Sequence, residues 1–79
     1  MKVRVKLFGT LSYDHPYYRP DKGLEVDIPP NAKIDDLLGH LKIAESHGIV
    51  VTINGRIMRS DDTLQSGADV HVFQSVFGG

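Results

Sequence analysis

The apolar residues of this chain change their spacing twice along the sequence, and that change restricts the possible folds more than any other feature. From residue 2 to residue 8, Val3, Val5 and Leu7 alternate with basic residues, which is the period of two expected of a half-buried strand. Further on, the spacing becomes i, i+3, i+4 and i+7, the stripe of an amphipathic helix. The residues of this stripe are Ile34, Leu37, Leu38 and Leu41. One such helix needs one apolar sheet face to cover.

Segments with strand-like alternation lie on both sides of the helical stripe. The predicted strands lie near 2–8, 23–29, 49–54 and 69–75, and the predicted helix lies near 34–43. Asn54-Gly55 predicts a tight hairpin, because a type I′ turn needs positive φ at both central residues, and Arg56–Met58 begin its return strand. The order predicts an α+β fold in a single domain over residues 1–79, with a mixed four- to five-stranded sheet and one main helix packed across one face.

The ends of the helix carry weaker signals than its apolar stripe. Lys33 is a poor N-cap residue, so Asn31 is an alternative cap, and Gly48 is a plausible stop. Gly39 inside the helix costs about 1 kcal/mol relative to Ala, which suggests that another part of the chain approaches the backbone there. Leu64, in a turn-rich connection, is expected to reach the core.

The composition excludes several classes of function. The chain has 79 residues and no cysteine, so disulfides and thiol chemistry of its own are excluded, and stability must come from apolar packing. Its formal net charge of −1 is not that of a nucleic-acid binder. No apolar run approaches the length of a membrane span, and the first residues enter a strand pattern at once, without a signal peptide. We therefore expect a cytoplasmic protein that binds neither nucleic acid nor membrane.

The last predicted strand offers a candidate docking surface. If Val70 and Val72 point into the core, His71 and Phe73 point outward. On the strand near 49–54, Val51 then faces inward. An exposed Phe beside other apolar residues is a plausible contact for a partner, although singly exposed hydrophobic residues are also normal.

Other polar and aromatic groups do not predict a site. The histidines, at positions 15, 40, 47 and 71, fit no short metal-ligand motif, so we expect no metal. The pairs Asp35-Asp36 and Asp61-Asp62 are better explained by a helix start and a turn than by acid catalysis. No Gly-rich phosphate loop is present. The aromatic loop 13–18 could stack on a ligand, but packing against the sheet edge is favoured.

The chain resembles the MoaD/ThiS family of sulfur carriers over its whole length. The resemblance rests on VKLFGTL near the start, IPPNAKIDDLLGHL leading into the helix and VTINGR at the hairpin. It also rests on SGADVHVF in the last strand and on the final Gly78-Gly79. Two closing glycines arise by chance on the order of 0.5% of the time, given average composition.

The resemblance implies a ubiquitin-like β-grasp fold and a function at the carboxyl terminus. A ubiquitin-activating-type adenylyltransferase would adenylate the carboxylate of Gly79 with ATP, and sulfur would then give a thiocarboxylate. Gly78 would be the slim residue behind it in a flexible tail, about 76–79, because glycine has no Cβ. Val76 and Phe77 would anchor in a partner. The chain itself would be a non-catalytic subunit with no bound cofactor, because the partner uses the ATP.

Several functions remain compatible with a Gly-Gly terminus. The first is sulfur transfer to molybdopterin, or its tungsten counterpart, beside a larger catalytic subunit such as that of molybdopterin synthase. Sulfur transfer to thiamine thiazole or another metabolite is a second, and conjugation to protein lysines through Gly79 is a third. The last alternative is a plain β-grasp interaction module. The acyl-adenylate is common to the first three, so Gly-Gly supports them equally.

Overall fold

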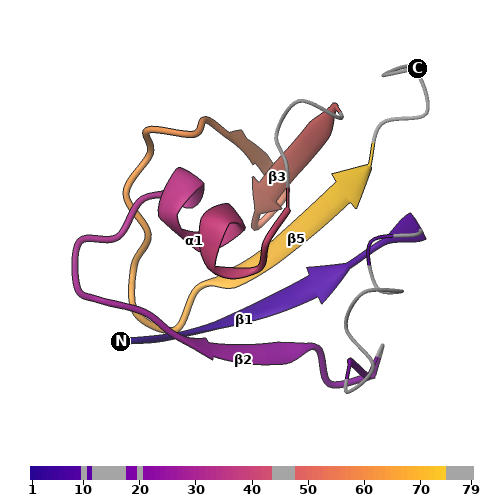
Figure 1. Cartoon of the computed structure of the whole chain (residues 1–79), viewed down its shortest axis with the longest axis horizontal. Helices are drawn as coiled ribbons and strands as arrows, with labels where there is room; N and C mark the ends of the chain where they lie inside the picture. The colour runs from indigo at the N-terminus through magenta and orange to yellow at the C-terminus, as the bar shows by residue number, and fades with distance from the viewer. Residues whose placement is uncertain (10, 12–17, 20, 44–47, 75–79) are drawn as a thin grey trace.

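The computed structural model describes residues 1–9, 11, 18–19, 21–43 and 48–74. In these residues the alternating segments form strands and the helical stripe forms a helix (Figure 1), and the predicted α+β fold is confirmed. The elements in chain order are β1 (Lys2–Leu7), β2 (Leu24–Asp27), α1 (Ile34–His40), β3 (Ile49–Ile53), β4 (Arg56–Met58) and β5 (Asp69–Gln74). The second strand is shorter than predicted, since it covers only the middle of 23–29.

The strands form one five-stranded mixed sheet in the order β2-β1-β5-β3-β4. The central pair, β1 and β5, is parallel, and Lys6 lies opposite His71. The other three pairs are antiparallel. The β3–β4 hairpin turns at Asn54 and Gly55 with φ of 53° and 81°, as the predicted type I′ turn requires.

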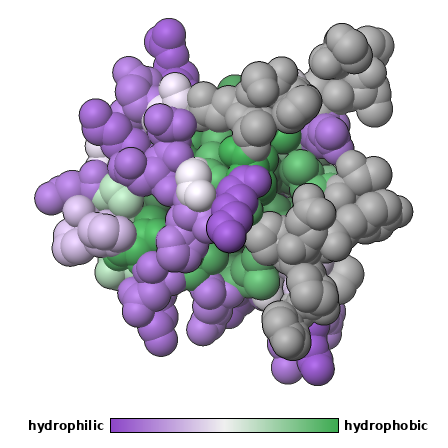
Figure 2. Space-filling view, viewed as in Figure 1, coloured by the Kyte–Doolittle hydropathy of each residue, from purple (hydrophilic) through white to green (hydrophobic). Residues whose placement is uncertain are grey.

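The inward residues of the sheet and the stripe of α1 form one apolar core. Leu37, Val5, Val70 and Val72 are completely buried, and Leu64 is 3% exposed, as predicted. The alternation in β1 and β5 is therefore assigned correctly, with the hydrophobic side chains inside. In the view of Figure 2 the described surface is largely hydrophilic, and apolar residues show between the polar ones.

The amino end of α1 is held by the connection that follows β4. The Ile34 N–H donates to the Asp62 carbonyl at 3.0 Å, and the Asp35 N–H donates to the Ser60 carbonyl at 2.9 Å. Lys33 is the N-cap residue, and its N–H donates to the Asp36 carboxylate at 2.9 Å. These contacts satisfy amide groups that a helix start leaves open, so a polar N-cap side chain is not needed.

The prediction of Asn31 as an alternative N-cap residue is wrong. Its φ of 67° places it outside the helix, and the Ala32 N–H donates to the Pro29 carbonyl at 3.2 Å. Positive φ at the third residue of such a turn, after a proline, is typical of a type II turn. Asn31 therefore directs the chain from β2 toward α1.

The carboxyl end of α1 comes earlier than predicted, at His40 instead of near residue 43, and Gly48 does not end it. Lys42 adopts φ of 59°, its N–H donates to the Gly39 carbonyl, and the Ile43 N–H donates to the Leu38 carbonyl at 2.9 Å. These are the two hydrogen bonds of a Schellman motif. A lysine occupies the left-handed position that glycine usually takes, so the sequence gives little sign of this end.

The expectation of a close approach at Gly39 is also wrong. A Cβ at this position would have no heavy atom within 4 Å. Gly39 lies on the exposed side of α1, so it weakens the helix without serving a packing contact in the described residues.

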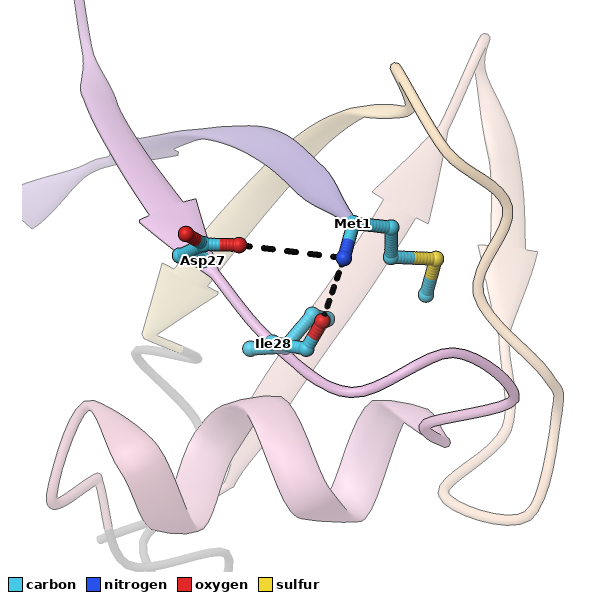
Figure 3. A network of polar contacts seen from close by, with 3 residues as sticks. All are labelled: Met1, Asp27 and Ile28. Carbon is cyan, nitrogen blue, oxygen red and sulfur yellow. Dashed lines mark hydrogen bonds and ion pairs between the residues drawn. The ribbon is translucent and has the colours of Figure 1, made fainter.

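Hydrogen bonds fix both ends of β1. At its start, the amino group of Met1 donates to the Ile28 carbonyl at 2.7 Å and lies 3.7 Å from the Asp27 carboxylate (Figure 3). At its end, the Leu7 N–H donates to the Tyr18 hydroxyl at 3.0 Å. Tyr18 thus takes the place of a strand neighbour where β2 no longer reaches, and it packs against the core. The favoured packing role of the aromatic loop holds for Tyr18, while residues 13–17 lie outside the described part.

Candidate functional site

The outward residues of β5 lie in the middle of the sheet face opposite the core. His71 and Phe73 alternate with the buried Val70 and Val72, as predicted, and both are partly exposed. Thr52 of β3 lies beside His71, and Val50 lies beside Phe73. This sheet face is called the outer face below.

An aromatic cluster forms the apolar part of the outer face. The rings of Phe8 and Phe73 are stacked, with centroids 4.5 Å apart and planes 11° apart. The ring of His71 lies 5.5 Å from that of Phe8 and 6.4 Å from that of Phe73. Contacts of this kind add about 0.5–1.5 kcal/mol to burial, so the cluster presents fixed apolar surface to solvent.

Phe8 is a member of this cluster that the sequence analysis missed. It continues the outward series of β1 one residue beyond the strand, and its N–H donates to the Val72 carbonyl at 3.0 Å. The alternation alone would place Phe8 outward. Only the parallel pairing of β1 with β5 places it beside Phe73, and this pairing joins residues far apart in the sequence.

Ile57 extends the apolar surface to the edge of the sheet. It lies opposite Thr52 in the β3–β4 hairpin, and its side chain is 74% exposed. A large hydrophobic residue with this exposure contributes little to the fold. Its place on the same face as the aromatic cluster makes it a candidate contact for a partner.

The other end of the outer face is charged. Arg4 lies 3.9 Å from Glu25, and His71 lies 3.9 Å from Asp69. These side chains are well exposed, so the Arg4–Glu25 ion pair contributes at most about 1 kcal/mol and less in salt. The His71–Asp69 contact is an ion pair only when His71 is protonated. The face therefore changes from compensated charge at the start of β1 to aromatic side chains at its end.

The carboxyl-terminal tail lies outside the described residues. Gln74 is the last described residue, and it follows Phe73 directly at the end of β5. The predicted roles of Val76, Phe77, Gly78 and Gly79 stay predictions. What the structure places is the end of β5 (Figure 1), where Phe73 of the aromatic cluster is followed by Gln74.

The described residues offer no enclosed site for chemistry. Among them no polar or charged side chain is buried, and no group of three or more His, Cys, Asp or Glu could hold a metal ion. Within the same residues, no helix has the length and apolar character that crossing a membrane requires. His15 and His47 lie outside the described part. What this part of the chain presents on the outer face is the aromatic cluster and the exposed Ile57.

In the described residues, β1 pairs in parallel with β5, and α1 packs across one face of the sheet. This is the arrangement of ubiquitin-like β-grasp proteins, and the chain is a protein of this class. The model of the ThiS family matches residues 5–79. The chain therefore belongs to the ThiS family, and the resemblance to the MoaD/ThiS sulfur carriers is confirmed.

Solved structures support the same class. A putative molybdopterin converting factor, subunit 1, from Pyrococcus furiosus has a TM-score of 0.74 and 26% identity over 96% of this chain and 99% of that one. Small archaeal modifier protein 1 (SAMP1) from Haloferax volcanii has a TM-score of 0.71 and 22% identity over 100% of both chains. The second likeness shows the fold alone. The comparison with curated proteins finds no significant match. Small carriers of the ThiS and MoaD type are generally non-catalytic.

Proposed function

We propose that this chain carries sulfur as a thiocarboxylate on Gly79 and donates it in the synthesis of molybdopterin, for a molybdenum or tungsten cofactor. The observation that carries the proposal is the ThiS family match, which runs through the fold to the final Gly78-Gly79. The likeness to a putative molybdopterin converting factor subunit supports this product over thiazole.

The proposed chemistry needs no catalytic side chain from this protein. A terminal carboxylate oxygen attacks the α-phosphorus of ATP, and pyrophosphate leaves. Hydrosulfide from the sulfur donor then attacks the carbonyl carbon of the acyl-adenylate, AMP leaves, and loss of the S–H proton gives the thiocarboxylate. Glycine suits both steps, because a residue without Cβ lets other backbones and ligands approach closely. The chain holds no cofactor in this scheme, since ATP binds to the partner.

Two partners follow from this scheme. The first is a ubiquitin-activating-type adenylyltransferase, and the second is a larger catalytic subunit that receives the sulfur, such as the molybdopterin synthase large subunit. We propose that both contact the outer face through Phe73 and His71, because these residues lie on β5, the strand that directly precedes the tail in the sequence. Val76 and Phe77 would fill a groove between this contact and the reacting carboxylate.

The test is intact-mass measurement after incubation with the cognate activating enzyme, ATP and a sulfur donor. The native chain should show replacement of one terminal oxygen by sulfur. Deletion of Gly79 should abolish this change and leave the unfolding temperature unaltered. Gly78→Val should also fail, because a β-branched residue is stiff and wide where the tail must enter the enzyme. Full activation of the deleted chain would refute the proposal.

Conjugation to proteins is the second candidate, and the likeness to a small archaeal modifier protein favours it. The same acyl-adenylate would then pass Gly79 to the amino group of a lysine. The two outcomes differ in mass, because a conjugate contains both chains. A stable branched product joined through Gly79, with no thiocarboxylate formed, would favour the modifier.

A further inference from the structure

One cation on the outer face has no acidic neighbour among the described residues. Arg4 lies 3.9 Å from Glu25. Lys2 lies opposite Asp27 across the β1–β2 pair. Lys6 has no acidic residue opposite it, because it lies opposite His71 on β5. Like Lys2, it makes no ion pair among the described residues.

On the β2 side, Lys6 lies beside Gly23, the residue that precedes β2. The residue at this position has φ of 72°, and a Cβ built there would lie 2.8 Å from the Val5 carbonyl oxygen and 3.3 Å from Cγ of Lys6. Any side chain at this position would have to displace the backbone. Glycine therefore lies where an acidic partner for Lys6 would stand in a longer β2, and a Cβ there would also lie 3.3 Å from Cγ of Arg4.

Lys6 also borders the aromatic cluster. It precedes Phe8 by two residues on the outer side of β1, and its side chain is only partly exposed. Lysine stems pack on apolar surface while the amino group stays in water. When a partner covers Phe8 and Phe73, the amino group of Lys6 loses part of that water, and a carboxylate then becomes its favoured neighbour.

We propose that the outer face binds a protein surface with an apolar centre and an Asp or Glu carboxylate beside it, and that this carboxylate pairs with Lys6. The proposal rests on the proposed function, since the partner is the cognate activating enzyme. Charge complementarity argues for this occupant: Lys6, which makes no ion pair among the described residues, lies between the aromatic cluster and the Arg4–Glu25 ion pair. Lys6 thereby selects among partners by the charge that they place at this border.

The experiment measures binding of the full chain to the cognate activating enzyme by titration, and ATP–pyrophosphate exchange as a function of carrier concentration. Lys6→Glu should weaken binding about 10-fold or more, because the partner carboxylate then meets a like charge. Lys6→Met keeps most of the stem and loses the charge, so it should weaken binding less and reduce its salt dependence.

Two control variants show whether the loss of binding is specific to Lys6. One tests the effect of the change in net charge, and the other tests the effect of removing a different cation from β1. Lys42→Glu makes the same change of charge beyond α1, on the other side of the sheet, and should bind within about twofold of the native chain. Arg4→Met removes a cation that already has Glu25, so its effect should be smaller than that of Lys6→Met. Equal weakening by Lys6→Glu and Lys42→Glu would overturn the inference.

The exchange assay separates failure of the inference from failure of the proposed function. If the inference holds, Lys6→Glu raises the KM for the carrier and leaves kcat unchanged, because Lys6 does not touch the reacting carboxylate. Normal exchange with the native chain and an unaltered KM for Lys6→Glu would refute the inference alone. No exchange with the native chain and its proven cognate enzyme would refute the proposed function, and the inference with it.

Discussion

Two isoleucines of this chain differ in burial so strongly that the same substitution tests the fold and the outer face separately. Ile34 begins α1 and is 1% exposed, whereas Ile57 lies on β4 and is 74% exposed. Ile→Ala removes three carbons, worth about 0.8 kcal/mol each when fully buried. At Ile34 a cavity adds to this loss, so we expect Ile34→Ala to lower the free energy of unfolding by about 3 kcal/mol or more.

At Ile57 only about a quarter of the side chain is buried, so the same deletion should cost about 0.6 kcal/mol. Urea unfolding followed by far-ultraviolet circular dichroism measures both losses, and an unchanged m-value shows that the two variants unfold from comparable states. In a domain of this size, the Ile34→Ala loss should lower the Tm by roughly 12 °C or more.

Binding to the activating enzyme should show the opposite order. Ile57→Ala removes an apolar contact of the outer face and should weaken binding, whereas Ile34→Ala acts behind the sheet and should leave the affinity of the folded fraction unchanged. Equal losses of stability in the two variants would show that the assignment of the inner and outer faces is wrong. Unaltered binding by Ile57→Ala would limit the contact surface to the strands nearer the centre.

Three further substitutions test single contacts. Tyr18→Phe removes the hydroxyl that accepts the Leu7 N–H and should cost about 1 kcal/mol in thermal unfolding; no loss would show that water replaces it. Gly23→Ala places a Cβ 2.8 Å from the Val5 carbonyl oxygen at a φ of 72° and should lower the free energy of unfolding by about 1–2 kcal/mol or more. A denaturant melt that coincides with the native curve would contradict this. Phe73→Asp should weaken binding to the activating enzyme about 10-fold or more while the circular dichroism spectrum is retained; unchanged affinity would move the interface elsewhere.

The sequence predicted the parts of the fold that depend on local pattern. The period of hydrophobic residues located the helix and the main strands, and Asn54-Gly55 located the hairpin with its turn type. The predicted inward and outward alternation of β5 also agrees with the structure. These features follow from side-chain period and from φ preferences, both of which act within a few residues.

The features that were predicted wrongly or missed depend on contacts across the chain. The first amides of α1 donate to the carbonyls of Ser60 and Asp62, so the helix needs no polar N-cap side chain and the sequence carries no such signal. α1 ends early, at His40, because Lys42 turns the chain with a positive φ. A lysine in this conformation is rarely predictable from sequence. Phe8 joined the candidate site only through the parallel pairing of the first and last strands.

The place of β5 in the sheet has a consequence for the synthesis of the protein. β5 comes last in the sequence but lies between β1 and β3, so on the ribosome these two strands lack their common neighbour until Gln74 has left the exit tunnel. Pairings between distant segments form slowly, and the chain exposes open strand edges until then. A product that stops before β5 keeps the β1–β2 and β3–β4 pairs but leaves one edge of β1 and one edge of β3 open, which makes it a better substrate for proteases.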